Sequence, residues 1–141
     1  MTPLYAQDRD YSKYLVLAVD DIPLNLLLVQ KMLSRFNFRL KTAANGQQAL
    51  DAVAAEKPDL ILLDLMMPGI DGFEVIRRLR ADSATSDIQI VILSALNSNE
   101  DIVKGFNVGA NDFIMKPIIM EKLLSCVVTQ LQLADAKAKA K

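Results

Sequence analysis

The sequence contains no histidine and only one cysteine, and each scarcity excludes classes of function. Without histidine, the chain lacks the commonest general base, the commonest metal ligand and any phosphohistidine of its own. The single cysteine, Cys126, cannot form an internal disulfide, and its place in the apolar pattern "LLSCVV" indicates a small buried hydrophobe. We therefore expect the reducing cytoplasm as the compartment of this protein.

Long apolar runs and blocks of basic charge are missing as well. No apolar run approaches the roughly 20 residues that span a bilayer. The opening "MTPLYAQDRDYSKY" has acidic residues where a signal peptide carries positive charge, so no export is indicated. The net charge of −1 offers no attraction to nucleic acid or to anionic lipid. We expect neither of these as a partner.

What the chain has in abundance is apolar residues, 52% of its 141 residues, which is typical of one folded domain. Five apolar segments predict β-strands, at residues 14–19, 38–43, 60–63, 88–93 and 112–115. The second, "FRLKTA", alternates in polarity, which suggests a strand near a sheet edge. Apolar spacings of three and four predict helices between the strands, marked by Leu24 to Phe36, Ala49 to Glu56 (after a cap at Asn45), Phe73 to Arg80, Ile102 to Phe106 and Ile119 to Leu131.

This alternation predicts an α/β fold: one doubly wound, five-stranded parallel sheet with five helices on its two faces. In such sheets, ligands bind beyond the carboxyl ends of the strands, where the winding reverses. We expect residues 1–13 to be an N-terminal extension and residues 14–133 to be the domain. Residues 134–141, "ADAKAKAK", are either the fraying end of the last helix or the start of a linker.

Polar residues follow or end four of the predicted strands. Asp20 and Asp21 follow the first, Asp64 the third, Ser94 the fourth and Lys116 the fifth. In a parallel sheet these ends share one edge, where three carboxylates repel one another and their pKa values rise unless a cation is present. Mg2+ prefers carboxylate and phosphate oxygens, and an ammonium and a hydroxyl suit a phosphate. The set predicts an acidic Mg2+ pocket suited to phosphoryl transfer onto an aspartate.

Each of these residues taken alone has a simpler explanation. The paired aspartates suit the cap of a helix that has proline in its first turn, and Ser94 suits a plain turn. A lysine before proline is usually a solvated surface residue, and a carboxylate such as Asp64 often turns the chain or caps the next helix. Gly69 and Gly72 most simply supply turn geometry. Their joint placement at the ends of different strands favours the acidic pocket.

Four motifs, "VDD", "LLDLMMPGIDGFEVIRRLR", "ILSA" and "GANDFIMKP", occur in the order and spacing of the receiver domain of bacterial two-component response regulators. The chain resembles that family over roughly Tyr14 to Leu131. The resemblance implies the flavodoxin-like fold of CheY-like proteins, with Asp64 as the phosphoacceptor. It also implies that Asp20, Asp21, Asp64 and the backbone carbonyl of Met66 hold Mg2+, with Asp20 acting through water.

The resemblance further implies a switch. Ser94 matches the switch hydroxyl, Phe113 the switch aromatic and Lys116 the lysine that contacts the phosphoryl group, with a cis peptide bond between Lys116 and Pro117. The simpler explanation for Phe113 is a core aromatic at a strand end. Because phenylalanine has no hydroxyl, any switch through this residue depends on packing alone.

The family also implies partners. A phosphohistidine on a histidine kinase or phosphotransfer protein docks near the first helix, and Asp64 attacks its phosphorus while Mg2+ and Lys116 take up charge. The surface of the fourth helix, the fifth strand and the fifth helix then changes and signals to a downstream partner. The chain is thus expected to be a signalling phosphoacceptor and not an enzyme.

Two positions concern the lifetime of the phosphoryl group in this family. The residues two beyond Asp64 and two beyond Ser94 are Met66 and Leu96. Neither side chain can orient an attacking water or accept its proton. We therefore expect slow self-dephosphorylation.

The first helix, in "PLNLLLVQKML", carries apolar residues on more than one stripe of its surface. The simpler explanation is a deeply covered helix, and the alternative is a docking face for a helical partner.

Other classes of function stay open. A Mg2+-dependent phosphatase with an aspartyl-phosphate intermediate would carry a second acid two residues after Asp64, where this chain has Met66. A phosphorylation-independent interaction domain would keep only the fold, yet the strand-end residues are intact here. No DNA-reading or cyclase motif follows, so the chain is either a stand-alone regulator or a receiver from a larger protein.

Overall fold

The computed structural model describes residues 10–140, so most of the predicted N-terminal extension lies outside the described residues. Strands and helices alternate along the chain: β1 (Leu15–Val19), α1 (Pro23–Met32), β2 (Arg39–Ala43), α2 (Gly46–Ala55), β3 (Leu60–Leu63), α3 (Gly72–Ala81), β4 (Gln89–Ser94), α4 (Asn99–Val108), β5 (Asp112–Met115) and α5 (Met120–Ala140). No helix among the described residues is both long and apolar enough to cross a membrane.

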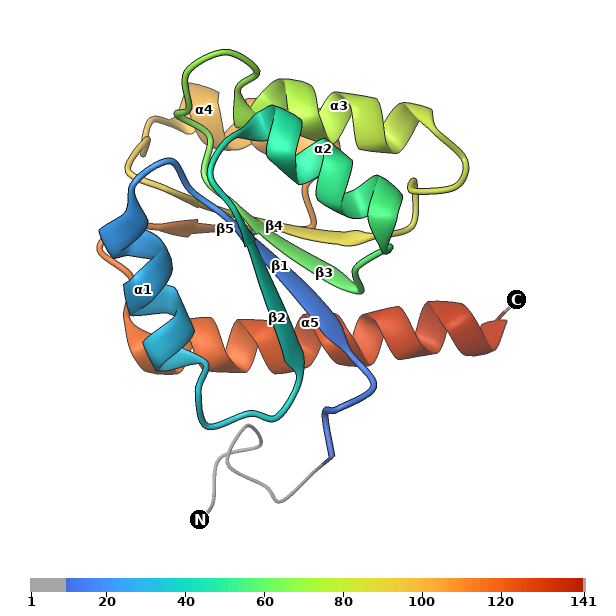
Figure 1. Ribbon diagram of the computed structural model, residues 1–141. Helices are drawn as coiled ribbons and strands as arrows, with labels where there is room; N and C mark the ends of the chain where they lie inside the picture. The colour runs from blue at the N-terminus through green and yellow to red at the C-terminus, as the bar shows by residue number, and fades with distance from the viewer. Residues whose placement is uncertain (1–9, 141) are drawn as a thin grey trace.

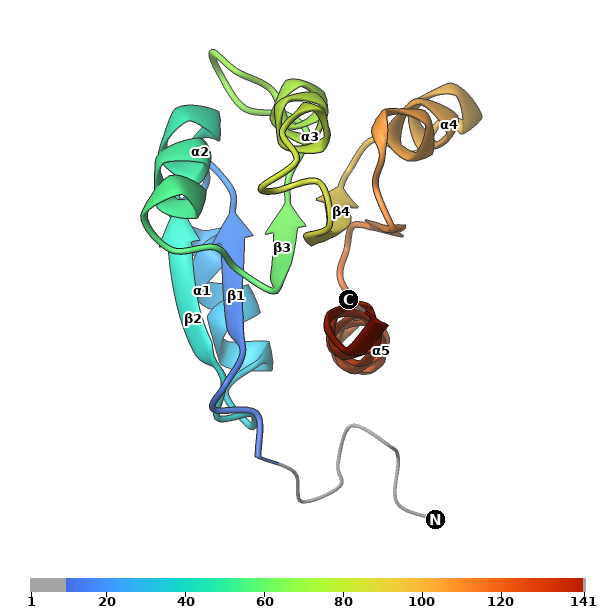
Figure 2. The same cartoon turned by 90° about the vertical axis from the view of Figure 1, so that its right-hand side faces the viewer.

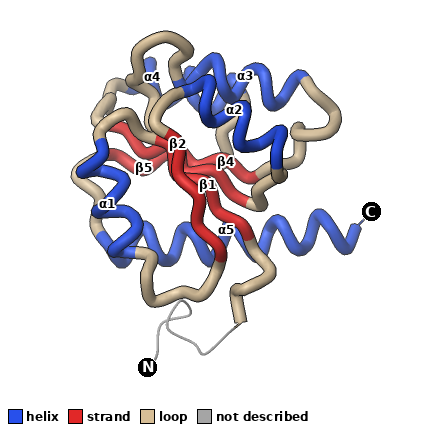
Figure 3. The backbone as a smooth tube through the Cα atoms, viewed as in Figure 1, coloured by secondary structure: helices blue, strands red, loops and turns tan. Residues whose placement is uncertain are grey.

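All five strands pair in parallel in one sheet, in the order β2-β1-β3-β4-β5. Helices α1 and α5 cover one face and α2, α3 and α4 cover the other (Figures 1 and 2). The winding reverses between β1 and β3. Figure 3 shows the strands in the middle of the fold with helices on both sides of them. The predicted doubly wound sheet is confirmed, and so is the edge position of the second strand.

The core consists of two apolar clusters, one on each face of the sheet. Along β1, Val16 and Ala18 belong to the cluster under α1 and α5, whereas Leu17 and Val19 belong to the cluster under α2 and α3. Strands buried on both faces read as continuous apolar runs, which is why β1, β3 and β4 were evident in the sequence. The edge strand β2 leaves Arg39 and other polar side chains exposed.

Side-chain caps fix the start of three helices. Asn45 accepts a hydrogen bond from the Gln48 N–H, which confirms the cap predicted for α2. Asp71 and Ser98 cap α3 and α4 in the same way. Each cap satisfies one of the N–H groups that a helix start leaves without a partner.

Helix α1 corrects an expectation. Within α1 only Val29 is buried, and Leu24, Leu27 and Leu28 are 61%, 57% and 46% exposed. The deeply covered helix favoured from the sequence is therefore wrong. The apolar surface of α1 faces outward, and this is the region in which a partner was the alternative explanation.

The C-terminal half of the chain holds two further outcomes. Cys126 is half-buried, and its thiol donates to Asp112 Oδ2 at 3.5 Å. Burial raises the pKa of this thiol to about 12, so it is an inert packing residue. Helix α5 runs to Ala140, so residues 134–140 continue the helix, and the Tyr14 hydroxyl donates to Asp135 within that stretch. The domain bounds themselves stay a prediction.

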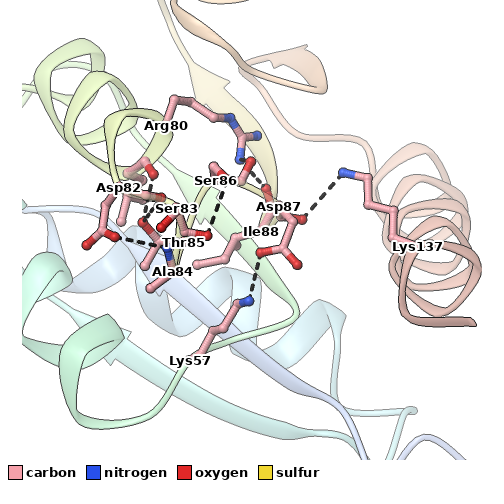
Figure 4. A network of polar contacts seen from close by, with 11 residues as sticks. Lys57, Arg80, Asp82, Ser83, Ala84, Thr85, Ser86, Asp87, Ile88 and Lys137 are labelled. Atoms are coloured by element: carbon pink, nitrogen blue, oxygen red, sulfur yellow. Dashed lines mark hydrogen bonds and ion pairs between the residues drawn. The ribbon is translucent and has the colours of Figure 1, made fainter. Parts of the chain in front are cut away.

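A polar network closes the end of the sheet opposite the strand carboxyl ends. The half-buried guanidinium of Arg80 donates to the carbonyls of Ser86, Ile88 and Gly109 and to the side chain of Asn111. Figure 4 shows this end of α3 beside the ion pair of Lys57 and Asp87, to which Lys137 of α5 also reaches. The network ties α3 and α5 to the loops before β4 and β5.

Candidate functional site

Sheet register brings the first and third strand ends together. Val19 of β1 pairs with Leu63 of β3, so the residues that follow them, Asp20 and Asp64, lie side by side at the carboxyl edge. The Asp64 N–H donates to the Val19 carbonyl at 3.0 Å, which holds this spacing. Carboxylate oxygens of Asp20, Asp21 and Asp64 lie within 4.8 Å of one another. That separation allows one small cation to contact all three.

Burial sets the electrostatics of this cluster. Asp20 and Asp64 are each only 6% exposed. Loss of hydration is the main cause that raises the pKa of Asp64, and the nearby Asp20 charge adds to it. The Lys116 ammonium and the backbone N–H groups of Met66 and Leu65 oppose that rise in pKa. The cluster therefore gathers more negative charge than its surroundings neutralise, and its oxygen donors fit Mg2+.

Lys116 is part of this cluster and not a solvated surface residue. Its Nζ lies 2.9 Å from Asp20 Oδ2 and 3.8 Å from Asp64 Oδ1. Its backbone N–H donates to the Ser94 carbonyl at 2.8 Å, so pairing of β5 with β4 places it. The peptide bond between Lys116 and Pro117 is cis, as the resemblance implied. The ammonium is positioned to neutralise charge at either aspartate.

The paired aspartates do not cap α1, so the simpler explanation for them is wrong. The cap position of α1 is Ile22, which makes no side-chain capping bond. Asp20 instead accepts the Ile22 N–H at 3.0 Å through Oδ1, while its other oxygen faces Lys116. Asp64 likewise caps no helix, because the cap of α3 is Asp71. The carboxylates of Asp20 and Asp64 are therefore available to the acidic cluster.

Ser94 and Phe113 lie on the two strands next to the acidic cluster. Ser94 ends β4, is fully buried and accepts the Leu96 N–H at 3.1 Å. The half-buried Phe113 packs against the cluster of apolar residues under α2 and α3. A Cβ added at Gly105 of α4 would lie 3.3 Å from the Phe113 ring, so helix and ring are closely packed. The ring is a core aromatic in this structure.

Apolar side chains line a hollow beside the loop that follows Asp64. Met66 is 60% exposed, and with Leu96 and Phe73 it lines a shallow hollow of about 400 Å³. Lys104 of α4 lies 4.2 Å from the centre of the Phe73 ring, a contact that joins α4 to α3. No pattern in the sequence predicts this contact, because it depends on how two helices pack.

Gly72 has a role other than the turn geometry expected for it. Of the described glycines only Gly69 and Gly109 have positive φ, so a turn requirement applies to Gly69 alone in this loop. At Gly72 a Cβ would lie 2.5 Å from the Asp64 carbonyl oxygen and 2.8 Å from Leu65 Cα. Gly72 is therefore needed for the close approach of α3 to the segment that carries Asp64.

The family model of the response regulator receiver domain matches residues 16–128. The chain belongs to this family. It is 44% identical over 103 residues to the response regulator PleD of Caulobacter vibrioides, covering 73% of this chain and 23% of PleD. It is 35% identical to the protein PilH of Pseudomonas aeruginosa over 79% of this chain and 93% of PilH.

Solved structures agree with this assignment. The chemotaxis protein CheY4 of Vibrio cholerae matches with a TM-score of 0.77 and 32% identity, over 82% of this chain and 97% of CheY4. The chain spans less than two thirds of the length of the first curated relatives. In PleD, for example, the matched region is 23% of the protein. Receiver domains are phosphoacceptor signalling modules that bind Mg2+ in an acidic pocket and interact with histidine kinases and effectors.

Proposed function

We propose that this receiver takes a phosphoryl group onto Asp64 from a phosphohistidine of a partner kinase or phosphotransfer protein, in a reaction that requires Mg2+. The observation that carries the proposal is the position of Asp64 at the sheet edge, with two further carboxylates within 4.8 Å and the Lys116 ammonium at 3.8 Å from Asp64 Oδ1. Both a cation and an ammonium can therefore neutralise charge at the oxygens of an incoming phosphoryl group.

In this proposal a carboxylate oxygen of Asp64 forms a bond to phosphorus as the phosphorus–nitrogen bond of the donor breaks. The imidazole leaves, and this chain supplies no histidine to compete for the phosphoryl group. Asp20, Asp21 and the Met66 carbonyl would hold Mg2+ with Asp64, and the ion when bound would offset negative charge on the phosphoryl oxygens. Lys116, which faces both aspartates, would donate to one of those oxygens.

The signal would leave through α4, β5 and α5. Ser94 would move toward the new phosphoryl oxygens, and Phe113 would repack beside Gly105 of α4. Exposed apolar side chains on this surface include Phe106 and Met115, each 45% exposed. Such side chains are suited to a downstream protein partner, and the net charge of −1 does not favour nucleic acid. The cytoplasmic compartment likewise stays a prediction.

Mass spectrometry after incubation with a small-molecule phosphodonor tests the phosphoacceptor. We expect a gain of one phosphoryl group that requires Mg2+ and is lost in Asp64→Asn. The matched control is Asp71→Asn, because that carboxylate caps α3 outside the cluster, and it should be modified like the wild type. Modification of Asp64→Asn would place the acceptor at another residue. No modification of the folded wild type would instead support the phosphorylation-independent interaction domain.

A slow loss of the phosphoryl group is expected from the side chains at positions 66 and 96. Met66 and Leu96 offer no group that can orient or deprotonate water. Met66→Gln should shorten the lifetime of the phosphorylated protein by about tenfold or more, since the amide can hold an attacking water. Met66→Leu is the control and should leave the lifetime unchanged. Decay of the wild-type phosphoprotein within seconds at neutral pH would show that another group activates the water.

A further inference from the structure

A cavity of about 290 Å³ lies beneath α1, next to the acidic cluster. The sheet, α1 and the loop after β5 line it, and it opens to solvent on the side where Leu28 is 46% exposed. Most of its lining is aliphatic: Ala18, Val19, Leu26, Leu28, Val29, Met32, Leu62, Leu93, Pro117 and Ile118. Asp20, Asn25 and Lys116 form its polar part. The cavity is thus apolar with a few polar groups, which is the usual character of a small-molecule site.

Packing of the core does not account for this space. The apolar side chains that line this open pocket stay in contact with water, so covering them with a ligand is favourable. The small side chain of Ala18 forms part of the sheet side of the cavity, and α1 buries only Val29 of its own length. A helix that packed fully on the sheet would fill this volume with its own side chains. Here the side chains of α1 leave this volume open to a ligand.

The polar part of the cavity has one group without a partner. Asp20 and Lys116 satisfy each other at 2.9 Å, and Asp20 also accepts from the Ile22 N–H. The half-buried side-chain amide of Asn25 makes no hydrogen bond to any other residue within 10–140. An amide offers two donors and one acceptor. A ligand that reaches Asn25 can therefore gain a hydrogen bond, in place of water, without breaking one within the protein.

We propose that this cavity binds a small, largely apolar molecule of two rings or similar size that carries one neutral hydrogen-bonding group, which Asn25 contacts. An apolar cavity of about 150 Å³ is known to hold benzene, so the larger volume here can take a second ring. A charged ligand is disfavoured, because the largely aliphatic lining offers a charge nothing to replace its lost hydration. Binding requires neither Mg2+ nor phosphorylation.

Indole is a suitable probe, and indene is its analogue of equal shape without the N–H group. We expect methyl NMR spectra of the metal-free protein to show saturable binding of one indole, with shifts at the cavity-lining Leu62, Leu93 and Ile118. Ala18→Leu should weaken binding at least tenfold, because the larger side chain fills the cavity. Leu27→Ser should change affinity less than twofold, since Leu27 lies on the exposed surface of α1 and outside the cavity.

The hydrogen-bonding claim has its own test. Wild-type protein should bind indole at least threefold more tightly than indene, and Asn25→Leu should remove that preference. If Ala18→Leu fails to fold by circular dichroism, Ala18→Val should still weaken indole binding. Absence of saturable shifts in the folded wild type, or unchanged binding in the folded Ala18 variants, would overturn the proposal. Loss of binding in Leu27→Ser would also overturn it and would assign the probe to the exposed face of α1.

Discussion

Replacing Gly72 with alanine is expected to lower the free energy of unfolding by about 2–3 kcal/mol. The added Cβ would lie 2.5 Å from the Asp64 carbonyl oxygen and 2.8 Å from Leu65 Cα. Both are backbone atoms, so no side-chain rotation relieves the contact. The Gly72 N–H also donates to the Leu65 carbonyl at 3.0 Å, and this bond holds the two segments at their present spacing. Urea unfolding followed by circular dichroism measures the change.

Gly69→Ala is the matched control in the same loop. Gly69 has a φ of 80°, and no atom lies within 4 Å of the position its Cβ would take. Its replacement costs only the left-handed backbone conformation, about 1 kcal/mol. The smaller loss in this variant would separate a clash from a backbone effect. If Gly72→Ala proves as stable as Gly69→Ala, α3 can move away from the Asp64 segment without cost.

The strands were largely predictable because burial on both faces leaves a pattern in the sequence. Leu60–Leu63 and Asp112–Met115 match the predicted bounds of β3 and β5. The predictions for β1 and β2 began one residue early, at Tyr14 and Phe38, both of which are buried although they precede the strands. Hydrophobicity reports burial and not the hydrogen-bonding ladder, so it extends a strand into neighbouring core residues.

The way α1 packs on the sheet could not be predicted from the sequence. Its apolar residues cover more than one stripe, and composition alone does not say which stripe meets the sheet. The exposure of Leu24 and Leu27, and the cavity behind Val29, follow from how far the helix lies from β1 and from the loop after β5. That distance is set by tertiary packing, which a single-helix pattern does not contain.

Some features of the candidate site could be predicted from the sequence, and others depend on tertiary packing. Parallel strands predict that Asp20, Asp64 and Lys116 gather at one edge, since the chain order alone places them at strand ends. The sequence does not tell which aspartate the ammonium contacts, and the structure places it closer to Asp20 than to Asp64. The requirement for glycine at position 72 was hidden too, because it depends on the distance between two backbone segments.

Asp64→Asn is expected to reverse the order of stability with and without Mg2+. In metal-free protein near neutral pH the variant should melt at a higher temperature than the wild type, because burial makes the ionised Asp64 carboxylate costly. Since the folded-state pKa of Asp64 is raised, protonation stabilises the fold at low pH and this contribution is lost as the pH rises through that value. The advantage of the variant should therefore shrink as the pH falls toward the ordinary aspartate value of 3.8.

With Mg2+ the wild type should overtake the variant. Mg2+ at one hundred times its dissociation constant stabilises a native state by about 2.7 kcal/mol, which corresponds to a rise of about 10 °C in Tm for a domain of this size. The variant should lose most of this gain, because it removes one of the three carboxylates that lie within 4.8 Å of one another. Thermal melts in chelator and in MgCl2 measure both effects.

Asp71→Asn again serves as the control, since it keeps an N-cap for α3 and leaves the acidic cluster intact. It should show the same rise in Tm with Mg2+ as the wild type. A variant Asp64→Asn that is less stable than the wild type in chelator would mean that Lys116 and the backbone N–H groups outweigh the cost of burial. An equal Mg2+ effect in wild type and Asp64→Asn would place the ion elsewhere, because loss of one of three carboxylates cannot leave the affinity of this cluster unchanged.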